Sequence, residues 1–111
     1  MKKSILAASI LVASTPALAV DPAYALAKFR FCIDAANHVN DKPAFEAYKI
    51  ELRAETSKHT PAALEALVPG TLDAYEIMEV ELNNELLETG KVNLATHCSR
   101  IQKTITLNTS E

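Results

Sequence analysis

Two cysteines, Cys32 and Cys98, constrain the fold of this chain more than any other feature. Each lies on the apolar stripe of a predicted helix, because Cys32 repeats at helical spacing with Phe29, and Cys98 with Leu94 and Ile101. A disulfide between them would join the first helix to the last. It would close a loop of about 67 residues. Because this lowers the entropy of the unfolded chain, the bond would stabilise the fold by about 4 kcal/mol. The alternative is a pair of free, buried thiols. We predict the disulfide.

Residues 1–19 have the pattern of a cleaved export signal peptide. Lys2 and Lys3 precede a short apolar run, Ile5 to Ala13, and Ala17-Leu18-Ala19 supplies the small residues that a signal peptidase requires. The run is shorter than the roughly 20 residues that cross a bilayer as a helix. We therefore expect a bacterial protein that is periplasmic or secreted. Its residues 20–111 would form one domain with no membrane insertion after cleavage, in an oxidising space where disulfides form.

Cap and turn residues divide this domain into helices. Asp or Thr close to a proline predicts three helix starts, at Asp21-Pro22, at Asp41 before Pro43, and at Thr60-Pro61. Apolar spacings of three and four then predict helices over about 22–39, 42–57, 61–67 and 72–88. A last helix is expected to carry the residues from Leu94 to Ile105. Pro69-Gly70 is expected to end the short third helix, Thr71 to cap the fourth, and Gly90 to follow it in the left-handed conformation.

The predicted fold is all-α. Two glycines in the whole chain are too few for the turns of an all-β fold. The first helix has a second apolar side, so it is expected at the centre, covered on two sides. We predict a small antiparallel helical bundle of four long helices plus one short helix, with one disulfide joining the first and last helices.

The charge of the predicted mature chain is negative and unevenly placed. Of 11 basic residues, Lys2 and Lys3 belong to the signal, which leaves 9 against 14 acidic residues and a net charge of −5 with His neutral. Nucleic acid is therefore a poor partner, as is an anionic membrane. Residues 59–90 contain no Lys or Arg. Within them we single out six acidic residues as candidates for binding a protein partner with a cationic surface: Asp73, Glu76, Glu79, Glu81, Glu85 and Glu88.

The commoner explanation of an acidic run is a solvated face that keeps a protein soluble, and for these six residues this alternative stays open.

Tyr24 and Phe31 are also candidates for binding a partner. They are seven residues apart on the second apolar side of the first helix, so they share one stripe. If exposed, they would form an aromatic anchor for a partner; the alternative is packing against a neighbouring helix.

No pattern of catalytic, metal-binding or cofactor-binding residues stands out. His97 and Cys98 are adjacent, and adjacent helical side chains point about 100° apart, which does not make a nucleophile and its base. The three histidines are not paired at i+3 or i+4, and no Cys-x-x-Cys-His haem motif occurs. Met78 could be a haem ligand in a bundle, but it falls on a stripe that the core needs. We therefore expect no enzymatic activity, no metal and no cofactor.

The sequence leaves three functions open. The first is a small exported, non-enzymatic binding protein, an inhibitor or immunity-type protein that occludes a basic protein partner through the acidic helix face. The second is a periplasmic acid-stress chaperone, because a small helical domain with one disulfide (here Cys32–Cys98) resembles proteins of the HdeA type in architecture. That resemblance implies action in acid. Below about pH 3 the carboxylates would be protonated, and the positive charge left on the chain would loosen the fold and expose its core. The third is a sensor or assembly subunit of an envelope complex. The sequence does not determine the partner or the oligomeric state.

Overall fold

The computed structural model describes residues 21–107, so the predicted signal peptide lies outside the described residues. The described chain is mostly helical and contains the predicted Cys32–Cys98 disulfide. Its elements follow one another as α2 (Pro22–His38), α3 (Lys42–Thr56), α4 (Pro61–Thr89), β2 (Lys91–Asn93), α5 (Leu94–His97) and β3 (Thr104–Thr106).

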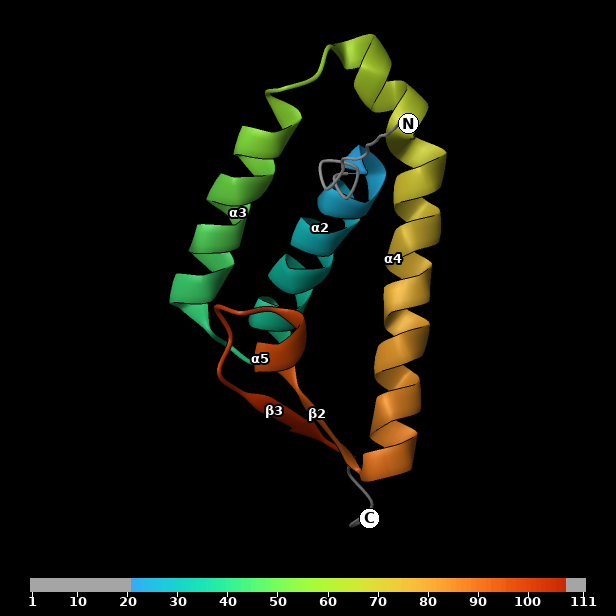
Figure 1. Cartoon of the computed structure of the whole chain (residues 1–111). Helices are drawn as coiled ribbons and strands as arrows, with labels where there is room; N and C mark the ends of the chain where they lie inside the picture. The colour runs from blue at the N-terminus through green and yellow to red at the C-terminus, as the bar shows by residue number, and fades with distance from the viewer. Residues whose placement is uncertain (1–20, 108–111) are drawn as a thin grey trace, which may run out of the picture.

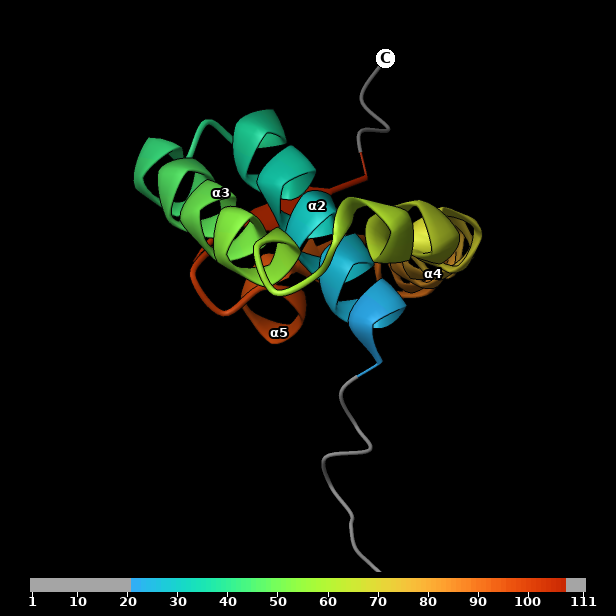
Figure 2. The ribbon, with the colours of Figure 1, turned by 90° about the horizontal axis from the view of Figure 1, so that it is seen from above.

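The three long helices form one layer with α2 at its centre. Helix α2 packs against both α3 and α4, which lie on opposite sides of it (Figures 1 and 2). Helices α2 and α4 run in the same direction, and α3 runs in the opposite one. The prediction that the first helix is central is thus confirmed. One face of α2 carries Cys32 and is covered by α5 and the β2–β3 hairpin. Helical geometry places Leu26 and Arg30 on the opposite face, away from Cys32.

The predicted helix starts at Asp21, Asp41 and Thr60 are confirmed, although the helix that begins after Thr60 is long, and Gly90 ends α4 as predicted. Each capping side chain accepts a hydrogen bond from a backbone N–H of the first turn and so satisfies a donor that has no partner within the helix. The bonds are Ala23 N to Asp21, 3.0 Å, Ala44 N to Asp41, 3.2 Å, and Ala63 N to Thr60, 3.1 Å. Gly90 ends α4 with φ of +79°, the left-handed conformation that glycine adopts most readily.

The prediction of a short third helix ending at Pro69-Gly70 is wrong, because α4 runs unbroken through both residues. A proline inside a helix costs about 3 kcal/mol, since it removes one hydrogen bond and crowds the preceding turn. Packing of α4 on α2, which begins beside Gly70, outweighs this cost. Gly70 lies against α2, where an added Cβ would come within 3.1 Å of the Ala23 Cβ. Thr71 is therefore no N-cap, and its hydroxyl donates to the Leu67 carbonyl within the helix.

The prediction of a long last helix is also wrong, so the described part of the chain has three long helices instead of four. Only Leu94–His97 is helical, and β2 pairs antiparallel with β3, with Val92 opposite Ile105. Leu94, Cys98, Ile101 and Ile105 were predicted to share one helical stripe. They reach the core instead from a short helical turn, the loop after it and a strand. Thr104-Ile105-Thr106 is a β-branched run with alternating exposure, which favours a strand over a helix.

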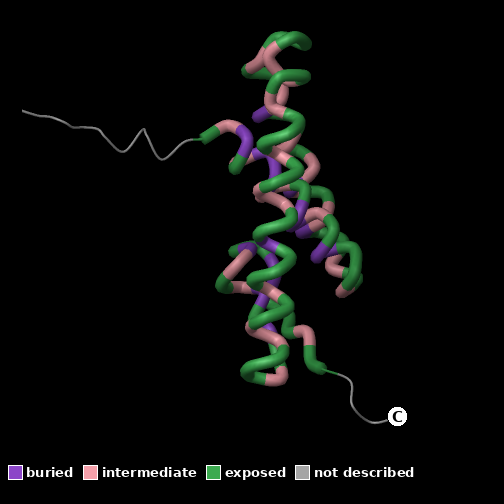
Figure 3. Tube along the Cα trace, turned by 90° about the vertical axis from the view of Figure 1, so that its right-hand side faces the viewer, coloured by how far each residue is buried: buried purple, intermediate pink, exposed green. Residues whose placement is uncertain are grey.

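The core is centred on the disulfide. The Cα atoms of Cys32 and Cys98 are 5.8 Å apart, and both side chains are inaccessible or nearly so. Val92, Leu94 and Ile101, all from the segment after α4, have no exposed surface. By contrast, α4 contributes only Met78 to the buried residues. Figure 3, seen from the α4 side, shows the buried residues gathered on α2 and the C-terminal segment, with α4 largely exposed or intermediate.

Candidate functional site

The outer face of α4, which points away from α2, carries exposed apolar side chains. Ile77 is 58% exposed, Val80 51% and Leu87 72%. With exposed Asp73 and Asn84 they follow spacings of four, three, four and three, which place all five on one stripe opposite the buried Met78. We call these five residues the outer stripe. Apolar residues at this spacing are typical of a helix that packs against another helix.

Acidic residues flank the outer stripe on both sides. Helical geometry places Glu76 along one side and Glu81 and Glu88 along the other, while Glu79 lies further round the helix, toward Tyr75. All four are exposed, and within residues 21–107 none of them takes part in an ion pair. With Asp73 they are five of the six acidic residues that the sequence singled out. Helix α4 therefore presents an apolar strip inside an acidic border.

The sixth acidic candidate, Glu85, interacts within the chain itself. Its carboxylate lies 2.7 Å from Nε2 of His97, and both side chains are about two-thirds buried. This contact ties α4 to α5 across the turn at Gly90. Glu85 therefore belongs to the contact between these two elements and stands apart from the exposed border.

Tyr24 and Phe31 do not form a shared exposed anchor. Phe31 is buried and meets the ring of Tyr75 edge to face, with 5.8 Å between the ring centroids. Tyr24 is 48% exposed, and the Lys28 ammonium lies 5.8 Å from the centroid of its ring. Phe31 thus joins α2 to α4 in the core, and only Tyr24 is available at the surface.

A groove lies over α2 on the face away from Cys32, between the end of α3 and the first half of α4. Its cavity of about 450 Å³ is lined mainly by apolar side chains, including Leu26, Leu52 and Val68. At its polar end the Tyr75 hydroxyl donates to Asp34. Burial, this hydrogen bond and the charge of Asp34 together raise the pKa of Tyr75 to about 12. The sequence pattern did not predict this groove, because it depends on the angle between two helices.

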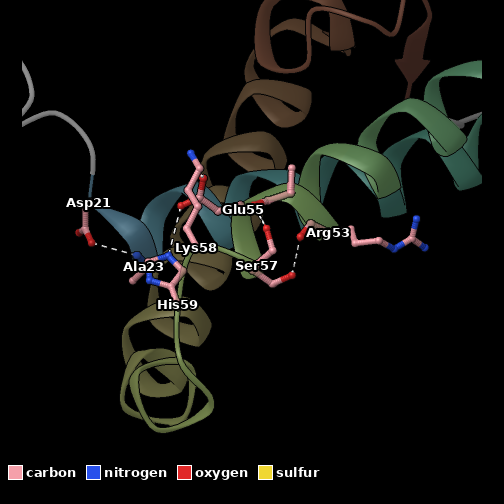
Figure 4. A network of polar contacts seen from close by, with 9 residues as sticks. Asp21, Ala23, Arg53, Glu55, Ser57, Lys58 and His59 are labelled. Carbon is pink, nitrogen blue, oxygen red and sulfur yellow. Dashed lines mark hydrogen bonds and ion pairs between the residues drawn. The ribbon is translucent and has the colours of Figure 1, made fainter.

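A polar cluster closes the end of α3 (Figure 4). Glu55 is buried, with its carboxylate 3.2 Å from Lys58 Nζ and 3.4 Å from His59 Nε2. Burial raises the pKa of Glu55, but the hydrogen bonds and charges of Lys58 and His59 outweigh it, so the pKa lies below its usual value. Because the buried acid of α3 pairs with Lys58 and His59 of the turn that follows, this cluster holds the turn into α4.

The remaining chemistry of the described residues is limited. Both cysteines are in the disulfide, so neither is a free thiol beside His97. Nowhere in residues 21–107 do three His, Cys, Asp or Glu side chains come together in a way that could hold a metal ion. What this part of the chain offers a ligand is therefore a surface, the outer stripe with its acidic border, and the apolar groove.

Sequence reasoning found the acidic border but missed the outer stripe. It assigned Leu72, Tyr75, Met78, Leu82 and Leu86 to the core side of this helix, and of these Met78 is buried while Leu72 is 65% exposed. The second apolar series, Ile77, Val80 and Leu87, was visible at spacings of three and seven. A helix with two apolar sides cannot bury both against a single neighbour.

No family model matches the chain, and neither does any curated protein or solved structure. None of the helices within residues 21–107 combines the length and the apolar character that crossing a membrane requires.

Proposed function

We propose that this is an exported, periplasmic or secreted, non-enzymatic binding protein of inhibitor or immunity type. It engages a basic protein partner through the outer face of α4. One observation carries the proposal: α4 exposes Ile77, Val80 and Leu87 along one stripe, bordered by acidic residues that form no ion pair within residues 21–107. A stripe of large apolar side chains that the chain leaves uncovered is typical of an interaction surface.

The charges of α4 favour a cationic partner. Acidic side chains three or four residues apart share one helical face and repel, at a cost of a few tenths of a kcal/mol per pair. Helix α4 has no Lys or Arg of its own to relieve this, and of these acids Glu85 alone has a cationic partner within residues 21–107, His97. A one-signed field also steers an oppositely charged protein and raises its association rate. An apolar centre with a charged rim is the usual composition of a protein–protein interface. The acidic border would therefore orient the partner, and the outer stripe would supply the affinity.

The test is capture from an envelope extract with three versions of the mature protein: wild type, Glu76→Lys and Glu46→Lys. Glu46 is an exposed glutamate on α3, so its variant makes the same charge change on a helix without an acidic border. We expect one stoichiometric protein with wild type and with Glu46→Lys, and its loss with Glu76→Lys or at raised salt. If the recovered protein is a hydrolase or a nuclease, its activity should fall when the mature protein is added. Equal loss with both variants, or no such protein, would contradict the proposal.

A second candidate, the acid-stress chaperone, is favoured by the same exposed apolar stripe. Once its carboxylates are protonated, the border would no longer select cationic partners and the stripe would bind many unfolded clients. This function predicts suppression of client aggregation at about pH 3 and none at neutral pH. A single partner captured at neutral pH distinguishes the first function from this one.

A further inference from the structure

Resting on the proposed function, we infer that the element bound by α4 is a helix of the partner, with an apolar seam and Lys or Arg along both edges. The outer stripe follows the alternation of four and three that defines the a and d positions of a helical pair. On this register Ile77 and Asn84 take a positions, and Asp73, Val80 and Leu87 take d positions. From Asp73 to Leu87 the stripe runs about 21 Å along the helix at 1.5 Å per residue. That length matches a partner helix of about four turns.

The acidic border occupies the positions that choose a partner in helix pairs. Beside an a/d seam the e and g positions form ion pairs between helices, and here they hold Glu76, Glu81 and Glu88. A partner helix with basic residues at its own edges would meet three exposed carboxylates that have no ion pair in the described structure. Charge complementarity therefore specifies the edges of the partner helix, and the outer stripe specifies its centre.

A second copy of this chain is a poor occupant for the same reason. Pairing two α4 helices, whether parallel or antiparallel, places Glu76, Glu81 or Glu88 of one copy against glutamates of the other. Asp73 lies in the seam itself, so a symmetric pair would also desolvate two carboxylates with no cation beside them. The geometry thus points to a basic helix from a different protein at neutral pH.

Asn84 adds a condition on that helix. A polar residue at an a position lowers the stability of a helix pair unless it faces a polar group of the partner. It therefore fixes how the two helices are aligned along their length. Asn84 is exposed and lies midway between Val80 and Leu87 on the stripe. The partner helix is expected to place a polar side chain opposite it. Replacing Asn84 with Leu should then strengthen binding while loosening the register.

The test uses the mature protein and two synthetic peptides of about three heptads, both with Leu and Ile at a and d apart from one Asn that faces Asn84. One carries Lys at e and g, and the other carries Glu there. Titration followed by fluorescence anisotropy and amide NMR should show binding of the Lys peptide alone, with shifts centred on residues 73–88. Equal binding of the Glu peptide, or shifts centred on the groove of Leu26 and Leu52, would overturn the inference.

A matched pair of variants separates the outer stripe from the rest of α4. Val80 and Val68 are 51% and 50% exposed on the same helix, but Val80 lies on the outer stripe and Val68 lines the groove. Val80→Ser should weaken the Lys peptide about tenfold, and Val68→Ser should change binding by less than about twofold. Circular dichroism checks that both variants fold. Equal effects would contradict the inference.

Two further measurements separate this inference from the proposed function. Sedimentation at pH 7 should show a monomer, and a dimer abolished by Val80→Ser would identify a second copy as the occupant and overturn the inference. Cross-linking of α4 carboxylates to lysines of the captured partner should give lysines spaced three or four apart in one segment. A single captured partner cross-linked through a non-helical segment would overturn the helix and leave the proposed function standing.

Discussion

Helix α4 and the segment after it, residues 91–107, are neighbours in sequence and opposites in packing. Helix α4 is 29 residues long and buries only Met78. The shorter segment buries Val92, Leu94, Cys98 and Ile101 at 0–1% exposure. Both are rich in apolar residues, so hydrophobicity alone does not separate them. The difference is that the segment's apolar residues meet α2 around the disulfide, whereas Ile77, Val80 and Leu87 of α4 face away from the molecule.

This contrast separates two uses of apolar side chains in one small protein. In residues 91–107 they hold the fold, and removing one should lower stability. On the outer stripe of α4 they contribute little to folding, because burial against the protein's own chain is what stabilises. Substitutions in the two regions should therefore differ in their effect on stability, and the following predictions run from the largest expected effect to the smallest.

The largest effect is expected from the disulfide. Replacing Cys32 and Cys98 together with serine should lower the free energy of unfolding by about 4 kcal/mol, because the unfolded chain loses the constraint of a loop of about 67 residues. Urea denaturation of the double variant beside wild type measures this. Reducing wild type with dithiothreitol is the matched control and should give a similar loss. A loss below about 1 kcal/mol would show that the C-terminal segment stays in place without the bond.

The next effect concerns Leu94, which has no exposed surface. Leu94→Ala should cost about 2–5 kcal/mol, because it leaves a cavity beside the disulfide that its neighbours fill only in part. Chemical denaturation measures the cost, and Leu87→Ala on the outer stripe is the control with the same change of side chain. Similar costs for the two leucines would contradict the contrast between the regions.

The junction between the two regions is expected to give a smaller effect. Gly90 has φ of +79°, and an added Cβ would meet nothing within 4 Å, so the cost of a side chain there is conformational. Gly90→Ala should lower stability by about 1–2 kcal/mol. Gly90→Asn should cost less, since Asn tolerates this conformation better. Thermal unfolding of both variants measures the difference, and the reverse order would show that space, not backbone conformation, is limiting.

Local signals in the sequence predicted most of the fold, and the errors share one cause. Caps at Asp21, Asp41 and Thr60 depend on a single turn of chain, so they could be identified directly. Pro69 was misread because its cost is local, whereas the packing of α4 on α2 that outweighs it is not. Ile101 and Ile105 fit a helix by spacing, but pairing across the β2–β3 hairpin decides their conformation.

The candidate site was predictable in its charge and not in its apolar part. The absence of Lys and Arg from residues 59–90 is a property of the sequence alone. Which apolar residues of α4 remain exposed depends on how many neighbours the helix has. The structure gives it one long neighbour, α2, so Ile77, Val80 and Leu87 stay outside. A second apolar series on a helix is thus the signal to look for when a chain has few helices to cover it.

The smallest expected effect compares two valines, one from each region. Val80 is 51% exposed on the outer stripe, and Val92 is fully buried in β2. Val80→Ser should change the free energy of unfolding by less than about 0.5 kcal/mol, because Val and Ser have similar helix propensities and the site is open to water. Val92→Ser should cost at least about 2 kcal/mol, since it removes buried methyl groups and buries a hydroxyl. Urea denaturation of both variants gives the two values.

The near-zero value at Val80 matters most, because it decides what the exposed stripe is for. A variant that keeps full stability but loses binding of the Lys-edged peptide separates recognition from folding at a single side chain. If Val80→Ser instead lowered stability as much as Val92→Ser does, the outer face of α4 would be packed against the protein's own chain in solution. The outer stripe would then have no free surface to offer a partner, and the binding role of α4 would have to be abandoned.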